Sequence, residues 1–227
     1  MDLVKVLRDF IQYYFLFIPL IIGIVKFKKL DRGLKILLVY LLYCLISEMI
    51  MMYLAKVYHN NLFYYNIYPF LDFIIISTYT SHIIELNKLK KWIRRVFFPF
   101  FIIVFGIYLI TQFDQLDKVT LPEFRSIGSF IIVISILFYY YSLLVKRSYA
   151  NLFSNPHFIV SIGLIIYYAG TFMTWLFLET LFTTNLELFS LFSSTIHIFL
   201  FLFIKYFTIL IAILKAGFSK SLGNVGA

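Results

Sequence analysis

Four ionisable side chains lie deep inside long apolar segments of the sequence. Glu48 and Asp72 lie near the middle of two neighbouring segments, and His197 and Lys205 lie near the middle of the last one. A charged side chain at the centre of a membrane costs roughly 2.5–3.5 kcal/mol on insertion scales, so such residues usually face the protein interior and pair with one another. We therefore expect a polar site where these segments meet.

The spacing of the polar residues gives two of the segments a polar face. Tyr68, Asp72 and Tyr79 follow one another at intervals of four and seven residues, which places them on one side of a helix. Ser194 and Lys205 fall in a narrow sector of the last segment at 100° per residue. We predict that Lys205 pairs with Asp72, Glu48 or both. The pocket around this pair is predicted to be lined by Tyr68, Tyr79, His197 and Ser194.

The predicted charges do not balance, because two acids face one base. Either one carboxyl group carries a proton, since burial disfavours its charged form, or a cation or a ligand amine binds beside it. An interpretation without a ligand also stays open. In that case Lys205 extends its ammonium group to the cytoplasmic interface, and Glu48 is a neutral acid in a structural hydrogen bond.

The composition is that of an integral membrane protein. Of 227 residues, 62% are hydrophobic and only 14% are charged, against about 25% charged residues in soluble domains. A span needs about 20 mostly apolar residues, and runs of this length without alternation predict helices rather than barrel strands. We expect an all-α protein that forms one bundle over residues 1–227. Seven segments qualify as spans: Phe10–Val25, Leu34–Val57, Leu62–Ile84, Val96–Phe113, Ile127–Val145, Phe158–Phe182 and Leu186–Ala216.

Basic residues predict the orientation, because Lys and Arg are enriched in cytoplasmic loops. The poor side holds Lys5, Arg8, Lys56, Lys118 and Arg125. The rich side holds Lys26, Lys28, Lys29, Arg32, Lys35, Lys88, Lys90, Lys91, Arg94, Arg95, Lys146, Arg147, Lys215 and Lys220. We therefore expect the N-terminus outside and the C-terminus in the cytoplasm.

The formal charge of +9 belongs to this cytoplasmic face and does not indicate nucleic-acid binding. Its first expected role is contact with the lipid bilayer. A second is docking of a cytoplasmic or membrane protein partner on two basic loops. Those loops contain Lys26, Lys28, Lys29 and Arg32, and Lys88, Lys90, Lys91, Arg94 and Arg95.

Motifs for catalysis or metal binding are missing from the sequence. Cys44 is the only cysteine, which excludes an intrachain disulfide and a multi-cysteine metal site. No two histidines have H-x-x-x-H spacing, and the sequence has no G-x-S-x-G elbow and no Gly-rich phosphate loop. We assign no catalytic residue and no metal site, and the sequence names no cofactor.

Two resemblances add expectations. The stretch Ser47–Asp72, with its Asn60-Asn61-Leu62 turn, and the stretch His197–Ile213 resemble a group of small seven-helix bacterial membrane proteins. That resemblance implies the fold and a bacterial cytoplasmic membrane, but no activity.

A lysine in the seventh span also resembles retinal-binding proteins, in which it forms a Schiff base opposite a carboxylate of the third span. Lys205 and Asp72 would take those parts. The acid that this family has four residues before the lysine is Phe201 here, and the sixth span offers only Trp175.

Two classes of function follow from these observations. In the first, the protein is a membrane-embedded sensor or regulatory subunit, whose central site binds a ligand or proton and whose basic loops contact a partner. In the second, it is a small transporter or ion pathway, in which the buried acids bind a cation or carry protons.

Overall fold

The structure is a computed structural model that describes residues 10–146 and 152–216. It is 88% helical, and the described residues include no β-strand. The α-helices are α2 (Phe17–Val25), α3 (Arg32–Val57), α4 (Leu62–Ile83), α5 (Asn87–Trp92), α6 (Phe98–Thr111), α7 (Pro122–Lys146), α8 (Pro156–Leu176), α9 (Leu178–Thr184), α10 (Leu186–Ser190) and α11 (Phe203–Lys215). The expectation of an all-α protein is confirmed.

Short helices of other types extend several of these elements. Three are π-helical: η1 (Phe10–Tyr14), η3 (Ile93–Phe97) and η6 (Leu191–Leu202). Three are 3₁₀ turns: η2 (Phe27–Lys29), η4 (Phe113–Gln115) and η5 (Leu152–Ser154). The π-helical η3 directly precedes α6, which has Pro99 in its first turn. A π-bulge is one way in which a helix accommodates a local irregularity.

Four helices within the described residues are long and apolar enough to cross a membrane, judged by length and composition. They are α3, the continuous helix Asn87–Thr111, α7 and α8. The structure is therefore compatible with an integral membrane protein. Helix α4 is not one of the four, and it carries the polar side chains Asn66, Asp72, Ser77 and Thr80 in its buried face.

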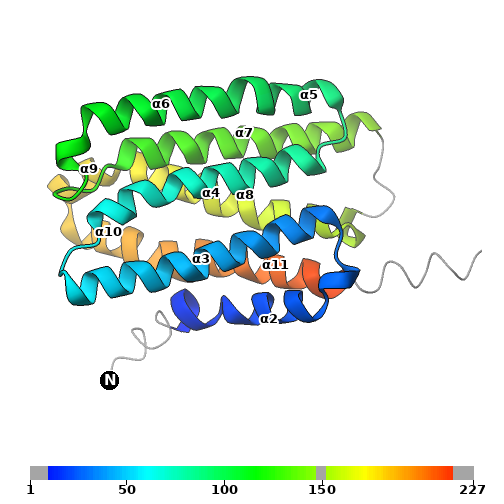
Figure 1. The fold of residues 1–227 in the computed structure, drawn as a ribbon, viewed down its shortest axis with the longest axis horizontal. Helices are drawn as coiled ribbons and strands as arrows, with labels where there is room; N and C mark the ends of the chain where they lie inside the picture. The colour runs from blue at the N-terminus through cyan, green and yellow to red at the C-terminus, as the bar shows by residue number, and fades with distance from the viewer. Residues whose placement is uncertain (1–9, 147–151, 217–227) are drawn as a thin grey trace, which may run out of the picture.

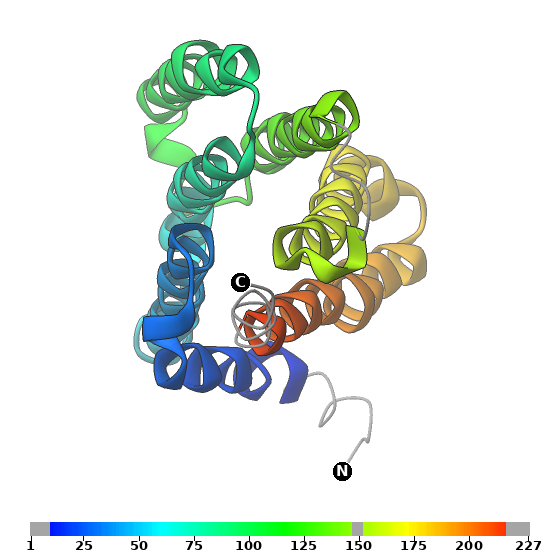
Figure 2. The same ribbon diagram turned by 90° about the vertical axis from the view of Figure 1, so that its right-hand side faces the viewer.

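The long helices run side by side and form a ring. Figure 2 looks along their axes and shows α2, α3, α4, α7, α8 and α11 in this order around the ring. Contacts between successive helices close it, including those of α11 with α2. Helix α6 lies outside the ring, against α4 and α7. The buried apolar side chains form one contiguous core.

The two ends of the bundle differ in charge. One end, here called the Asp31 end, holds the connections from α2 to α3 and from α4 to α5; the opposite end, the Asn60 end, holds those from α3 to α4 and from α6 to α7 (Figure 1). Both predicted basic loops lie at the Asp31 end. Within them Lys28, Lys29, Arg32, Lys88, Lys91, Arg94 and Arg95 are exposed, while Lys26 and Lys90 are half-buried.

Short polar side chains and prolines begin several of the helices. Asp31 Oδ1 accepts a hydrogen bond of 2.9 Å from the backbone N–H of Leu34 and caps α3. Asn155 caps α8 in the same way through the N–H of His157. Such caps satisfy backbone donors that have no partner inside the helix. Helix α7 begins at Pro122, five residues before the predicted span start at Ile127, and this places Arg125 inside the helix.

Aromatic rings attach the outer helix α6 to the ring of helices. The ring centroids of Phe73 and Phe101 are 3.7 Å apart, and those of Phe70 and Phe105 are 4.2 Å apart. Phe124 of α7 packs against both Phe101 and Phe105. Since α6 exposes most of its other side chains, this aromatic cluster is its main attachment.

Gly163 permits the close approach of α8 and α11. A Cβ atom at this position would overlap the Thr208 side chain of α11. We expect Gly163→Ala to lower the free energy of unfolding by about 1–3 kcal/mol, the usual cost of overpacking. Thermal unfolding in detergent measures the change.

Gly106→Ala is the matched control, because no atom lies within 4 Å of a Cβ built there. Thr208→Ala should restore part of the stability in the Gly163→Ala background, since it removes the overlapping atoms. An unchanged unfolding temperature in Gly163→Ala would contradict this account of helix packing.

Candidate functional site

The Asp72 carboxylate lies in the interior of the helix ring and accepts hydrogen bonds from tyrosines. Tyr40 donates its O–H to Asp72 Oδ1 over 2.9 Å, and Tyr168 donates to Oδ2 over 2.7 Å. Tyr68 makes a longer contact of 3.5 Å with Oδ1. Asp72 is 7% exposed. Three helices, α3, α4 and α8, therefore meet at one carboxylate.

The Lys205 ammonium group joins this arrangement from α11. Lys205 is 1% exposed, and its Nζ donates a hydrogen bond of 3.1 Å to the Tyr40 hydroxyl. The ammonium also lies 3.8 Å from the ring centroid of Tyr167 and 4.6 Å from that of Tyr206. Cation–π contacts of this kind stabilise a desolvated ammonium group by roughly 2 kcal/mol.

Lys205 and Asp72 are linked through a tyrosine and do not touch. Their charged atoms form no ion pair within 4.0 Å, and the connection runs from Lys205 through the Tyr40 hydroxyl to Asp72. The predicted direct pair is thus replaced by a bridged one. The physical reason is the order of helices in the ring, in which α3 brings Tyr40 between α4 and α11. We call Asp72, Tyr40, Tyr68, Tyr168 and Lys205 the Asp72 network.

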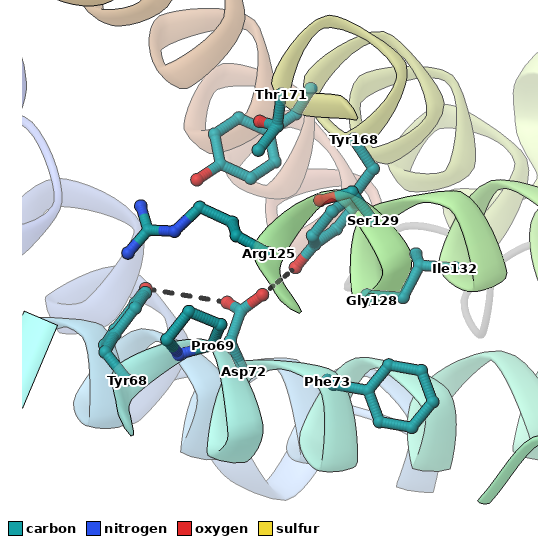
Figure 3. Close-up of a pocket in the computed structure, with 11 residues that line it drawn as sticks. Tyr68, Pro69, Asp72, Phe73, Arg125, Gly128, Ser129, Ile132, Tyr168 and Thr171 are labelled. Atoms are coloured by element: carbon teal, nitrogen blue, oxygen red, sulfur yellow. Dashed lines mark hydrogen bonds between the residues drawn. The ribbon is translucent and has the colours of Figure 1, made fainter. Parts of the chain in front are cut away.

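A small pocket lies beside the network, between α4, α7 and α8 (Figure 3). Its cavity volume is ≈ 20 Å³, which is room for about one water molecule. Asp72 and Tyr68 of α4, Arg125 and Ser129 of α7, and Tyr168 and Thr171 of α8 belong to its lining.

Arg125 is held in place by hydrogen bonds to Tyr65, whose backbone carbonyl is left free by a proline in α4. Pro69 has no backbone N–H, so the carbonyl of Tyr65, four residues earlier, lacks its helical donor. Arg125 Nη2 donates to that carbonyl oxygen over 3.1 Å, and Nη1 donates to the Tyr65 hydroxyl over 3.3 Å. The guanidinium carbon also lies 4.2 Å from the Tyr65 ring centroid and 4.8 Å from that of Trp175. A proline within a membrane helix is tolerated when a neighbour satisfies the freed carbonyl in this way.

Arg125 changes the charge balance expected for the site. The sequence predicted two acids against one base, but Arg125 lines the same pocket as Asp72. Counting Glu48, Asp72, Lys205 and Arg125 gives two acids and two bases. These four residues therefore contain no excess of acid that would require a bound cation.

A layer of aliphatic side chains lies on the Asp31 side of the network. Each of the five helices around the network contributes one side chain to it, and all five are 0% exposed: Leu37, Ile76, Ile136, Leu164 and Ile209. On α4, α8 and α11 these residues come one helical turn beyond Asp72, Tyr168 and Lys205. All belong to the same contiguous core. These aliphatic side chains lie between the network and the Asp31 end, beside buried polar groups such as Ser77 and Thr80.

The structure brings some of the other predicted site residues near the network. The His197 ring lies 5.5 Å from that of Tyr167, whose ring contacts Lys205, and His197 Nδ1 is buried without a hydrogen-bond partner. Glu48 is half-buried on α3, close enough to act electrostatically on Tyr206. The Ser194 side chain lies outside the described ones.

Tyr79 does not line the pocket, contrary to the prediction. It comes two helical turns beyond Asp72, and its hydroxyl makes a hydrogen bond of 3.2 Å with His157 Nδ1 at the Asp31 end. His157 Nε2 lies 3.1 Å from Asp31 Oδ2. A spacing of seven residues keeps Tyr79 on the same helix face as Asp72 but places it about 10 Å further along the helix axis. Tyr79 instead ties α4 to the start of α8, and His157 ties α8 to the start of α3.

Sequence reasoning missed Tyr40, Tyr168 and Arg125. The two tyrosines lie away from the ends of their helices, whereas tyrosines of an interfacial belt lie at the ends. That position was the available signal for Tyr40 and Tyr168. For Arg125 two signals were available: the helix start that Pro122 favours, and the carbonyl that Pro69 leaves without a donor.

The bridge between Lys205 and Asp72 predicts an energetic coupling. Tyr40→Phe removes the acceptor of Lys205 and a donor to Asp72, so we expect a loss of about 1–3 kcal/mol in the free energy of unfolding. Combining Tyr40→Phe with Lys205→Met should cost less than the sum of the single losses, because the two residues act on each other. Thermal unfolding of the four proteins measures the coupling. Tyr53→Phe, at an exposed position, is the control, and strictly additive losses would contradict the bridge.

The Asp31–His157 pair predicts a loss of stability in acid. Burial alone would raise the pKa of Asp31, but the hydrogen bond and the charge of His157 hold this pKa below its usual 3.8. A carboxyl with a lowered pKa stabilises the fold above its unfolded-state pKa, and this stabilisation disappears as the pH falls through the folded-state pKa. The unfolding temperature should therefore fall below about pH 4.

Asp31→Asn removes the charge of the side chain but keeps the helix cap, because Asn caps helices as well as Asp does. This variant should unfold at a lower temperature near pH 5 and should lose less on acidification than the unmodified protein. Asp114→Asn, at an exposed acid, should leave the fall of the unfolding temperature in acid unchanged. If the unfolding temperatures of Asp31→Asn and of the unmodified protein fall by the same amount on acidification, the Asp31–His157 pair does not cause the loss of stability.

Comparison with protein-family models, curated proteins and solved structures found no match to this chain. The resemblances to small seven-helix bacterial membrane proteins and to retinal-binding proteins therefore stay predictions from short motifs. The account of the site rests on its geometry.

Proposed function

We propose that the protein is a membrane-embedded sensor that binds a proton at Asp72. In this proposal the chain crosses a bacterial cytoplasmic membrane seven times, with its N-terminus outside and its C-terminus in the cytoplasm. The Asn60 end then faces outward and the basic Asp31 end faces the cytoplasm. The observation that carries the proposal is the chain of hydrogen bonds from Lys205 through Tyr40 to Asp72, beside a small pocket.

The network has the properties that a proton switch needs. Asp72 is the acceptor for two tyrosine hydroxyls from different helices. A neutral carboxyl group would carry its own O–H and would be a weaker acceptor, so protonation would weaken these hydrogen bonds or reverse one of them. Protonation would thus act on α3 and α8 at once, and through Tyr40 on Lys205 of α11. A local change of charge is coupled in this way to the packing of several helices.

The packing on the Asp31 side favours a sensor over a transporter. A transporter or ion pathway needs access to its site from both sides, whereas Leu37, Ile76, Ile136, Leu164 and Ile209 are fully buried on the Asp31 side of the network. The pocket, with room for about one water molecule, suits a proton better than a large ligand. A Schiff base between Lys205 and retinal would need a much larger cavity, and we do not propose one.

A sensor of this kind needs a way to report its state. We propose that a cytoplasmic or membrane partner reads the Asp31 end. The exposed basic residues of the two loops, Lys28, Lys29, Arg32, Lys88 and Lys91 among them, are the surface available for it. The same surface contacts anionic lipid headgroups.

Infrared spectroscopy tests the proton site directly. A pH titration of the protein in lipid should produce the C=O stretching band of a neutral carboxyl group, and Asp72→Asn should remove this band. Glu48→Gln is the matched control, because it removes the other deep acid and should leave the band in place. A band that persists in Asp72→Asn and disappears in Glu48→Gln would assign the proton to the wrong carboxyl and overturn the proposal.

Flux measurements separate the sensor from the alternative. Proteoliposomes with a pH dye inside should show no proton flux beyond that of empty liposomes, since fully buried aliphatic side chains lie on the Asp31 side of the network. Proton flux that is lost in Asp72→Asn would favour the transporter instead.

A further inference from the structure

Helices α3, α4 and α8, which meet at the Asp72 carboxylate, meet a second time at the Asp31 end. The second meeting point is the imidazole ring of His157, at the start of α8. Its Nε2 lies 3.1 Å from Oδ2 of Asp31, at the start of α3, and its Nδ1 makes a hydrogen bond of 3.2 Å with the Tyr79 hydroxyl of α4. Since Tyr79 follows Asp72 by seven residues on α4, the two meeting points lie about 10 Å apart along that helix.

The His157 ring is accessible from the solution, whereas its tyrosine partner is buried. The side chain of His157 is 20% exposed and that of Asp31 is 51% exposed, while Tyr79 is 0% exposed. Fully buried side chains lie between the two meeting points on each of the three helices: Leu37, Ile76 and Leu164. A proton from the solution at the Asp31 end can therefore reach His157 without passing the Asp72 network.

A proton on His157 would reverse its hydrogen bond with Tyr79. In the neutral ring, Nε2–H donates to Asp31 and Nδ1 accepts the O–H of Tyr79, whereas in the imidazolium ion both nitrogens donate. The buried hydroxyl of Tyr79 then needs another acceptor for its own proton, because a buried donor without a partner is costly. Histidine is the side chain whose charge ordinarily changes between about pH 5 and 8. The contact between α4 and α8 can thus depend on the pH of the solution.

Charged groups of both signs surround His157. The Asp31 carboxylate, in direct contact with the ring, stabilises an imidazolium ion. The basic groups on the neighbouring elements oppose it: Arg32 of α3, His82 of α4 and Lys90 of α5. Asp31 is therefore the group that would hold a proton on His157.

The remaining titratable groups at this end have partners of their own. Glu85 pairs with Lys146 of α7 over 3.0 Å. Lys215 of α11 donates a hydrogen bond of 2.9 Å to the backbone carbonyl of Phe153. The hydroxyl groups of α7 that act electrostatically on Tyr79 are those of Tyr139 and Tyr140.

We propose that His157 is a second proton-binding site, which faces the cytoplasm and is coupled to Asp72 through α3, α4 and α8. This inference rests on the proposed function, in which the Asp31 end is cytoplasmic and Asp72 binds a proton. Each of the three helices carries one group of each site, so a change in contacts at one site acts on the helices of the other. By linkage, a proton at either site changes the proton affinity of the other by the same factor. The sensor would combine the state of Asp72 with the acidity of the cytoplasm.

Nuclear magnetic resonance of the imidazole nitrogens tests the site in the unmodified protein. The chain has four histidines, and His157→Gln identifies the signals of His157 by their loss. In protein that carries nitrogen-15 histidine and is reconstituted in lipid, both nitrogens of His157 should be protonated at the acidic end of a titration from about pH 8 to 5. At the other end Nδ1 should be unprotonated. Signals of His157 that do not change over this range would overturn the proposal.

Asp31→Asn tests the partner of the proton. We expect the midpoint of the His157 titration to fall by about half a pH unit or more, because the imidazolium ion loses its negative neighbour. Solvent limits the shift, since it screens a half-exposed pair. Asp114→Asn, at an exposed acid of the opposite end, is the matched control and should leave the midpoint in place. An unchanged midpoint in Asp31→Asn would overturn the role of this pair.

The infrared band of Asp72 tests the coupling. His157→Gln should shift the pH midpoint of this band, whereas His59→Gln, at an exposed histidine of the Asn60 end, should not. If His157→Gln does not fold, Asp72→Asn decides, because coupling is reciprocal and the His157 midpoint should then shift. An Asp72 midpoint that is the same with and without His157 would overturn the coupling.

The two signals separate this inference from the proposed function. A His157 titration without an Asp72 band would overturn the proton site at Asp72 and, with it, the coupling. An Asp72 band in a protein whose His157 signals do not change with pH would leave the proton sensor and overturn the second site.

Discussion

The structure depends on keeping one ammonium group and one carboxylate away from water in the middle of a helical bundle. Neither Lys205 nor Asp72 could remain charged in hydrocarbon without partners. The tyrosine-bridged arrangement meets this constraint, because hydroxyl groups solvate both charges and aromatic faces surround the ammonium. It also dictates which helices must be neighbours. The ring order that brings α3, α4, α8 and α11 together is the order in which the two charges can be satisfied.

The constraint explains why the sequence predicted the site in part. The depth of Asp72 and Lys205 could be counted from the ends of the apolar segments, and expensive residues at mid-depth are expected to converge. Their mode of contact could not be predicted, because it depends on which side chain of a third helix reaches between Asp72 and Lys205. Helical spacing alone also placed Tyr79 in the pocket, since a face repeats along the whole helix. Only the depth along the axis separates Tyr79, with its partner His157, from Asp72.

The fold was predictable to a similar degree. Long apolar runs without alternation predicted helices, and the described residues are helical over those runs. The exact starts were not predictable from hydropathy, because a helix begins where a cap or a proline permits it. The difference matters at α7, where a start at Pro122 instead of Ile127 turns Arg125 from a loop residue into a pocket residue. The position of α6 outside the ring follows from contacts among phenylalanines that no periodicity reveals.

The direction of the hydroxyl groups gives the network its capacity to switch. Tyr40 has one proton to donate, and it donates it to Asp72 while accepting from Lys205. A proton on Asp72 removes the need for that donation, and the hydroxyl can then turn toward Tyr168, 3.5 Å away. Lys205 would still need an acceptor, so the change cannot stay confined to α4. A buried charge that is solvated by rotatable groups therefore couples its own protonation to the helices that carry those groups, which a direct ion pair between Asp72 and Lys205 would not do.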